Sequence, residues 1–169
     1  MSTAAADRAL SRLRLVALDV DGVFTDGRFY LSDDGVESKS FNTQDGFGVR
    51  QLLKAGVAVA VISGRESAAV ERRMAELGVL HVVQGCSDKV AALEKLATRL
   101  NVSVADCAYV GDDVPDLPLL RKVGVSIAVA NAVTAVREFC DYTTVASGGF
   151  GAVREVSELV LAARTRPEK

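Results

Sequence analysis

The sequence predicts an α/β protein built on an open, doubly wound parallel sheet. Short, almost wholly apolar runs alternate with helical patterns along the chain, as is typical of parallel strands covered on both faces. Aromatic residues make up only 5% of the chain and Trp is absent, so Ala, Val and Leu must fill the core. The length of 169 residues fits a single domain.

The apolar runs and the helical patterns predict where each strand and each helix lies. The apolar runs predict strands at residues 14–20, 58–63, 80–85, 107–111 and 125–130. The intervening segments predict helices at residues 45–56, 66–78, 87–100, 116–124 and 154–166. Gly56 and Gly78 are suited to end the first two helices, and Ser87 is suited to begin the third. This alternation of strands and helices favours the doubly wound arrangement.

One segment departs from the alternation. Residues 26–42 hold two short extended runs around Asp34-Gly35, which is a strong hairpin signal. We therefore expect a flexible N-terminal extension at residues 1–12 and one domain at residues 13–169, with a hairpin flap at 26–42 and a C-terminal tail at 148–169.

Composition argues against several classes of function. The net charge is −2, and no stretch combines Lys and Arg with aromatics, so nucleic-acid binding has little electrostatic support. No apolar run approaches the roughly 18 residues of a membrane span, and the first residues lack the apolar region of a signal peptide. The three Cys show no C-x-x-C spacing and favour reduced thiols. A cytoplasmic protein is expected.

Reactive side chains follow the predicted strands, where ligands bind in open α/β sheets. They are Asp19 and Asp21 at the end of the first strand, Ser63 at the end of the second, Lys89 after the third, and Asp112, Asp113 and Asp116 at the end of the fourth. Taken alone, Ser63 could equally be a helix cap, and Lys89 could be an ordinary surface residue. However, carboxylates this close repel one another unless a cation lies among them, and oxygen ligands favour Mg²⁺.

The set as a whole predicts a phosphatase. In this interpretation Asp19, the backbone carbonyl of Asp21, and Asp112 hold Mg²⁺, and Asp19 attacks the phosphorus atom. Lys89 and Ser63 stabilise the transferring phosphoryl group, while Asp21 serves as general acid and base. Asp113 and Asp116 are expected to orient Lys89 or the waters of the metal.

The motifs that carry this chemistry resemble those of the haloacid dehalogenase superfamily. They are DVDGVFTD (19–26), ISGR (62–65), Lys89 and GDDVPD (111–116). The segments FNTQDGFGVR (41–50), QGCSDK (84–89) and GGFGAVREV (148–156) are similar to those of its phosphatases for 3-deoxy-D-manno-octulosonate 8-phosphate, an intermediate of lipopolysaccharide synthesis. The resemblance implies a Rossmann-like fold without a separate cap domain, and a homotetramer in which a neighbouring subunit covers the active site.

The resemblance also implies which residues meet the sugar acid phosphate or shape its pocket. They are Asp21, Asn42, Thr43, Gln44, Asp45, Gly46, Arg50, Arg65, Arg73 and Lys89. Since Arg binds carboxylates with two hydrogen bonds, Arg65 is suited to the substrate carboxylate. A solvated helix face for Arg73 and a structural role for Arg50 stay open. If the tail at 148–169 reaches a neighbour's site, its deletion should damage activity more than stability.

Three other functions are compatible with parts of the pattern. A similar phosphatase for a nonulosonate 9-phosphate tends to carry an acidic residue at the position of Arg65, which favours the octulosonate. A signalling receiver domain also uses an acceptor Asp, an acidic pair and a Lys, but there the Lys comes last along the chain. A non-catalytic module would not need all four motifs.

Overall fold

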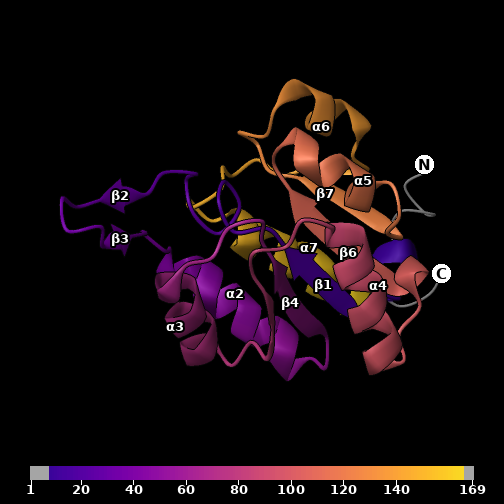
Figure 1. Cartoon of the computed structure of the whole chain (residues 1–169). Helices are drawn as coiled ribbons and strands as arrows, with labels where there is room; N and C mark the ends of the chain where they lie inside the picture. Colours follow the sequence, from indigo (N-terminus) through magenta and orange to yellow (C-terminus); the bar gives the residue numbers. More distant parts are fainter. Residues whose placement is uncertain (1–7, 166–169) are drawn as a thin grey trace.

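The computed structural model describes residues 8–165, and its centre is a six-stranded parallel sheet (Figure 1). In spatial order the strands are β5 (His81–Val83), β4 (Ala58–Ile62), β1 (Leu15–Leu18), β6 (Cys107–Gly111), β7 (Val125–Ala128) and β8 (Tyr142–Thr143). The strand order reverses at β1, as in a doubly wound fold. The predicted fold class is therefore confirmed.

Helices cover both faces of this sheet. They are α2 (Thr43–Lys54), α3 (Ala68–Leu77), α4 (Lys89–Leu100), α5 (Leu117–Leu120), α6 (Thr134–Phe139) and α7 (Ala152–Thr165). Right-handed crossovers place α2 and α3 on one face and α4, α5 and α6 on the other. α7 packs along α2, and Figure 1 shows it running behind β1. Gly48 permits this close approach, because a Cβ there would lie 2.7 Å from Ser157 Oγ.

The centre of the sheet is fully covered. All four residues of β1 are buried, as are all five of β6. This explains the unbroken apolar runs, since neither face of a central parallel strand meets water. Polar side chains that follow these strands therefore begin at the boundary of the core.

The flap is a short antiparallel hairpin, as predicted. β2 (Tyr30–Leu31) pairs with β3 (Glu37–Ser38), and the turn between them places Gly35 at a φ of 81°. Figure 1 shows the hairpin projecting from the domain on the side of α2 and α3. Its tip is exposed, with Tyr30, Leu31 and Val36 each more than half accessible to solvent.

Some elements differ from those predicted. The helix expected at 116–124 is a 3₁₀ turn at Val114–Asp116 followed by the single turn α5, in a segment that holds Pro115 and Pro118. A proline disfavours helical backbone at the residue before it and tends to end a helix there. α6 and β8 were not predicted. A further 3₁₀ turn lies at Val104–Asp106.

The two ends of the described chain belong to the packed domain. Residues 1–7 of the predicted N-terminal extension lie outside the described residues, but residues 8–11 are helical and Leu10 is fully buried. Within the predicted C-terminal tail, α7 buries Val153, Val156 and Val160. Deletion of residues 148–169 would thus remove core surface, so a loss of stability is expected beside any loss of activity. Among the helices within residues 8–165, none has the length and apolar character that crossing a bilayer requires.

Candidate active site

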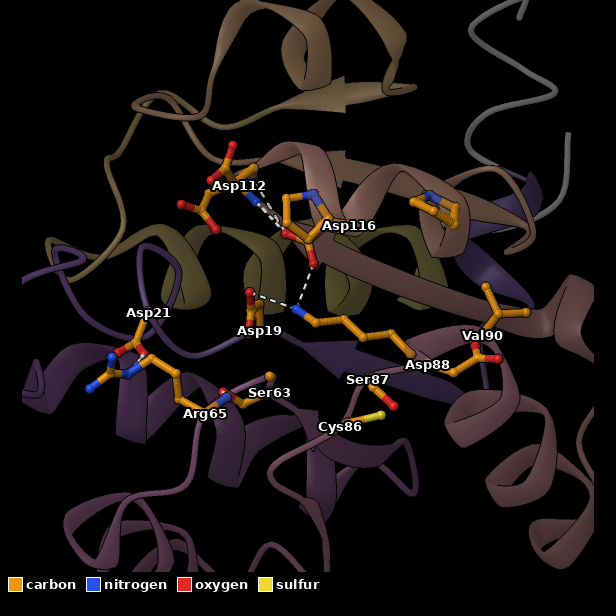
Figure 2. A pocket seen from close by; sticks show the side chains of 15 residues that line it. Asp19, Asp21, Ser63, Arg65, Cys86, Ser87, Asp88, Val90, Asp112 and Asp116 are labelled. Atoms are coloured by element: carbon orange, nitrogen blue, oxygen red, sulfur yellow. Dashed lines mark hydrogen bonds and ion pairs between the residues drawn. The ribbon is translucent and has the colours of Figure 1, made fainter.

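The carboxyl ends of the three adjacent strands β4, β1 and β6 open into one cleft of about 470 Å³ (Figure 2). The register of the sheet brings them level, because Leu18 pairs with Val61 on one side and with Val110 on the other. The cleft lining includes every predicted strand-end residue, together with Arg65: Asp19, Asp21, Ser63, Arg65, Lys89, Asp112, Asp113 and Asp116.

Lys89 lies at the centre of this cleft. It is the first residue of α4, and its Nζ lies 2.8 Å from Asp19 Oδ2 and 2.7 Å from Asp116 Oδ1. The same Nζ donates to the hydroxyl of Tyr109 at 3.1 Å. Burial alone would lower the pKa of Lys89, but the two carboxylates outweigh it and raise that pKa above its usual value. The side chain therefore stays a cation.

Asp116 fixes Lys89 in place. Its Oδ1 accepts from Lys89 and also from the Tyr109 hydroxyl at 2.7 Å, while Oδ2 accepts from the backbone N–H of Asp112 at 3.0 Å. The residue is only 1% exposed. Both oxygens are thus occupied by donors of the protein. Asp113, in contrast, forms no hydrogen bond or ion pair with Lys89 in the described part of the chain, and its carboxylate accepts from the N–H of Val114 at 2.7 Å.

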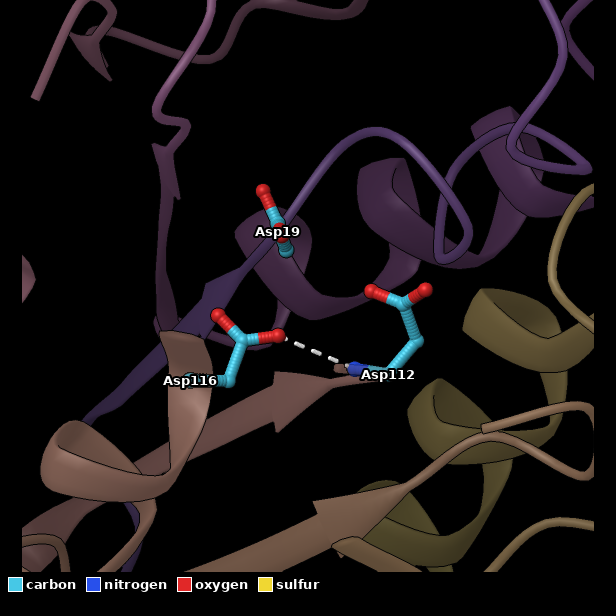
Figure 3. Close-up of side chains that lie close together, drawn as sticks. All are labelled: Asp19, Asp112 and Asp116. Carbon is cyan, nitrogen blue, oxygen red and sulfur yellow. Dashed lines mark hydrogen bonds between the residues drawn. The ribbon is translucent and has the colours of Figure 1, made fainter. Parts of the chain in front are cut away.

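Figure 3 shows three carboxylates facing one another, Asp19, Asp112 and Asp116. One oxygen of each lies within 4.8 Å of the others. Burial, followed by the charge of Asp116, raises the pKa of Asp19 to about 6 in spite of Lys89. Burial, followed by the charges of Asp19 and Asp116, raises the pKa of Asp112 to about 7. Within residues 8–165, no hydrogen-bond donor reaches the carboxylate of Asp112.

The loop after β1 lies directly against Asp112. Gly22 has a φ of 93°, and a Cβ built there would lie 2.0 Å from Asp112 Oδ2. Only glycine combines this backbone conformation with this approach. The loop after β1 therefore packs directly on the carboxylate of Asp112.

Ser63 and Asp21 lie on the other side of the cleft. Ser63 is 4% exposed, and its Oγ accepts from the N–H of Arg65 at 3.3 Å. Figure 2 shows the Asp21 side chain beside Arg65 and apart from the three carboxylates. Arg65 Nε lies 3.3 Å from Asp21 Oδ2. The α4 cap is one residue later than predicted, since Asp88 rather than Ser87 accepts from the N–H of Ala91.

The remaining predicted substrate residues do not line this cleft of their own chain. Asn42 caps α2, and its Nδ2 donates to the carbonyl of Gly149 at 3.3 Å. Thr43 and Gln44 are exposed in the first turn of α2. A Cβ at Gly46 would lie 2.4 Å from the guanidinium of Arg73, so the two residues pack together.

Asp45 serves the fold. It is fully buried, and its Oδ1 accepts from the N–H of Arg154 at 2.8 Å in the first turn of α7. Burial raises the pKa of Asp45, against the effect of the hydrogen bonds from that turn. The first turn of α7 covers this carboxylate, so within its own chain Asp45 supports the loop and does not line the cleft. Arg50 likewise donates to the carbonyl of Glu76 at 2.8 Å, and Arg73 pairs with the Glu76 carboxylate at 3.2 Å.

Known proteins resemble this chain over most of its length. The model of the haloacid dehalogenase-like hydrolase family matches residues 76–153. The 3-deoxy-D-manno-octulosonate 8-phosphate phosphatase KdsC of Salmonella typhi is 46% identical over 152 residues, which are 90% of this chain and 81% of that protein. This chain belongs to the KdsC family of haloacid dehalogenase-like hydrolases.

Solved structures of KdsC-family proteins agree with this fold. The 3-deoxy-D-manno-octulosonate 8-phosphate phosphatase from Yersinia pestis has a TM-score of 0.93 at 41% identity, over 95% of this chain and 86% of that one. The same phosphatase from Moraxella catarrhalis, in complex with a magnesium ion, a phosphate ion and a KDO molecule, has a TM-score of 0.93 at 42% identity. That match covers 97% of this chain and 94% of the other.

The residues of this KdsC-family site fit a hard divalent cation. Asp19 and Asp112 place carboxylate oxygen atoms, the ligands that Mg²⁺ prefers, within 4.8 Å of each other. Their raised pKa values show that the negative charge there is poorly compensated by the protein alone. A bound cation would remove this cost. Asp116 fits less well as a ligand, because both of its oxygens already accept hydrogen bonds.

Sequence reasoning missed three residues of the site. Tyr109 lies within a buried strand and reads as core, although its hydroxyl contacts both Lys89 and Asp116. Side chains alternate along a strand, so the residue two positions before the Gly-Asp-Asp motif lies on the same face as the first residue of that motif. A hydroxyl group at this position is the signal that could have identified Tyr109. Gly22, and Lys39, whose Nζ hydrogen-bonds to Asp21 Oδ1, gave no distinct signal, since their partners lie in other segments.

Proposed function

We propose that this protein is a magnesium-dependent phosphatase that hydrolyses 3-deoxy-D-manno-octulosonate 8-phosphate to the free sugar acid and phosphate. The observation that carries the proposal is the placement of Asp19, Lys89 and Asp112 in one cleft of a chain so similar to KdsC. A bound magnesium ion in the Moraxella relative supports the choice of metal.

Asp19 acts as the nucleophile. A carboxylate oxygen of Asp19 forms a bond to phosphorus as the bond between phosphorus and the sugar oxygen breaks, which leaves a phosphoryl group on Asp19. Water then attacks the phosphorus, the bond to Asp19 breaks, and phosphate leaves. Lys89 lies 2.8 Å from Asp19 and stays protonated, so it lowers the repulsion between the nucleophile and the anionic ester.

Asp21 moves the protons of both steps. It gives a proton to the departing sugar oxygen and later takes one from the attacking water, a contribution of typically ~10²–10⁴-fold. Its carboxylate borders the cleft near Asp19 without joining the three-carboxylate cluster, which supports a role distinct from that of the nucleophile. Ser63 adds a hydrogen bond to the phosphoryl group.

Asp19, Asp112 and the carbonyl of Asp21 would hold Mg²⁺, which when bound would supply positive charge to offset the nucleophile and the phosphoryl oxygens. Asp116 acts through Lys89, which it holds at 2.7 Å. Asp113 belongs to the same acidic turn but faces Val114, so any effect on the metal passes through water.

Arg65 binds the carboxylate of the sugar acid. Its guanidinium lines the cleft and its side chain is 47% exposed, so it can accept a ligand from solvent. Thr43, Gln44 and Arg73 lie outside the cleft of their own chain, and in this proposal they contribute to substrate binding through a neighbouring subunit.

The same proposal includes a cytoplasmic homotetramer that serves lipopolysaccharide precursor synthesis. Support for subunit contacts comes from the exposed apolar tip of the flap, where Leu31 is 67% accessible. The cysteines Cys86, Cys107 and Cys140 are free thiols, which fits a reducing compartment. Light scattering of the purified protein measures the oligomer directly.

Phosphate release tests the proposed function. We expect the purified protein to hydrolyse the octulosonate 8-phosphate in Mg²⁺ but not in EDTA, and to prefer it to a nonulosonate 9-phosphate. Asp19→Asn should abolish turnover while the protein stays folded. Asp106→Asn, which changes a carboxylate at the opposite end of β6, is the matched control. Near-normal rates for Asp19→Asn would show that the nucleophile is assigned wrongly.

A further inference from the structure

Lys39 is a buried cation on an otherwise exposed hairpin. Its side chain is 1% exposed, although it lies one residue after β3 and the tip of the same flap faces solvent. An ammonium group is almost never buried unless anions compensate it. The surroundings of Lys39 therefore show what holds the flap against the domain.

The compensating groups form a ring of alternating charge. Lys39 Nζ hydrogen-bonds to Asp21 Oδ1 and lies 3.6 Å from Glu37 Oε1. Arg65 closes the ring, with Nε 3.3 Å from Asp21 Oδ2 and Nη2 2.6 Å from Glu37 Oε2. Two members come from the flap and two from the loops that follow β1 and β4. Each oxygen of Asp21 thus faces one cation.

The ring of Phe29 lies over both cations. Its centroid is 4.2 Å from Arg65 Cζ and 6.0 Å from Lys39 Nζ. An aromatic face attracts cations at these distances and keeps water from one side of them. Phe29, like Lys39 and Glu37, belongs to the flap, so the docked flap both supplies and covers the charges around Asp21.

The two cations that face Asp21 are not equivalent. Arg65 is about half exposed, shares its guanidinium with Glu37, and borders the cleft. A ligand with an anionic group can therefore draw it away from Asp21. Lys39 is enclosed and faces no open space, so it is the anchor that remains when Arg65 is engaged elsewhere.

We propose that Lys39 is a positioning residue that holds the carboxylate of Asp21 in the orientation required for proton transfer to the leaving group. Lys39 does not touch the substrate in this account. Removal of its charge frees one oxygen of Asp21, and the carboxylate can then rotate away from the bond that breaks. The inference rests on the proposed function, because it concerns the acid of that reaction.

The test compares two substrates that differ in their need for an acid. Departure of a sugar alkoxide requires protonation, whereas 4-nitrophenolate leaves readily without it. The value of kcat/KM reports the steps up to phosphorylation of Asp19. In Lys39→Met we expect kcat/KM for the octulosonate 8-phosphate to fall by roughly 10- to 100-fold. This loss is smaller than the full contribution of a general acid, because Asp21 itself is still present. For 4-nitrophenyl phosphate kcat/KM should change by less than about threefold.

Three controls separate positioning from other roles. Lys95→Met removes the same charge from an exposed site on α4 and should leave both substrates unaffected. Lys39→Arg keeps the charge and should restore part of the rate. In the Asp19→Asn background, calorimetry should give the same dissociation constant for the sugar acid phosphate with and without Lys39→Met. Because Met fills the enclosed space and the flap lies outside the core, the melting temperature should not change.

Two results would overturn the inference. An equal loss of kcat/KM on both substrates would assign Lys39 a general structural role in the flap. A dissociation constant that weakens as much as kcat/KM falls would make Lys39 a substrate ligand. Failure of the wild-type protein to hydrolyse either substrate in Mg²⁺ would instead overturn the proposed function, and this inference with it, before any variant is compared.

Discussion

Asp112→Asn should have opposite effects on stability without and with magnesium. In the metal-free protein the ionised Asp112 faces Asp19 and Asp116, and burial with these two charges raises its pKa from 3.8 to about 7. A carboxyl group whose pKa is raised by folding opposes folding wherever it is ionised. Asn has nearly the same shape and no charge, so the substitution removes this penalty.

The size of the effect follows from the shift in pKa. A shift of about three units, at about 1.4 kcal/mol each, corresponds to about 4 kcal/mol at pH 8. Asp112 is partly exposed, and Asp19 shares the same repulsion, so screening and relaxation should leave about half of this. We expect a gain of about 2 kcal/mol in the free energy of unfolding, or about 4–8 °C in melting temperature.

Magnesium should reverse the order of the two proteins. A ligand at 100 times its dissociation constant stabilises the folded state by about 2.7 kcal/mol. The wild type should gain this amount, while Asp112→Asn, which lacks one of the proposed ligands, should gain little. Urea unfolding at pH 8, in EDTA and in excess Mg²⁺, measures the difference in stability between the two proteins without and with the metal. Asp113→Asn is the matched control, since the charge of Asp113 raises the pKa of Asp112 less than Asp19 and Asp116 do, and its effect should stay within about 0.5 kcal/mol in each condition.

A lower stability of Asp112→Asn than of the wild type in EDTA would contradict the predicted repulsion. That result would mean that the carboxylate contributes to folding through contacts that outweigh its repulsion. If Asp112→Asn keeps the full stabilisation by Mg²⁺, Asp112 is not a ligand of the cation, because other groups must then hold it.

Three further predictions concern the same cleft. The pKa values of Asp19 and Asp112 are raised by folding, so the metal-free wild type should gain stability as pH falls from 8 to about 5.5, and excess Mg²⁺ should remove this trend in melting temperature. Gly22→Ala should cost about 1–3 kcal/mol in urea unfolding and abolish turnover, because its Cβ would overlap a carboxylate oxygen of Asp112 at a positive φ. Gly35→Ala, also at positive φ but with open space around it, should lower stability less and keep full activity. Tyr109→Phe removes a hydroxyl bonded to the lysine ammonium at the cleft centre, so kcat should fall about tenfold at similar KM; an unchanged kcat would assign that hydroxyl to the core alone.

Local signals were sufficient for the central part of the site. Asp19, Ser63 and Asp112 each follow an apolar run directly, and the ends of parallel strands meet at one edge of a sheet. The residues could therefore be assigned to one cleft before the order of the strands was known. The order β4-β1-β6 then explains why these three segments in particular are neighbours.

Other features depend on partners far away in the sequence. Asp45 was predicted to meet the substrate or shape its pocket, and its carboxylate accepts from the N–H of Arg154, which lies 109 residues later. No pattern around Asp45 indicates that contact. Short elements were also missed, since α6 has six residues and β8 has two, too few to establish a periodicity.

The position of the nucleophile relative to its partners is a consequence of strand register. The N–H of Asp19 donates to the carbonyl of Val110 at 3.0 Å, which continues the β1–β6 ladder one residue beyond the strand. Asp112 follows Val110 by two residues, so the two carboxylates lie on neighbouring strand ends at a fixed offset. A slip of one residue would exchange the two faces of β6 and separate the two carboxylates. The fully buried residues of β1 and β6 resist such a slip, and in this way the apolar core holds two mutually repelling carboxylates in place for the cation.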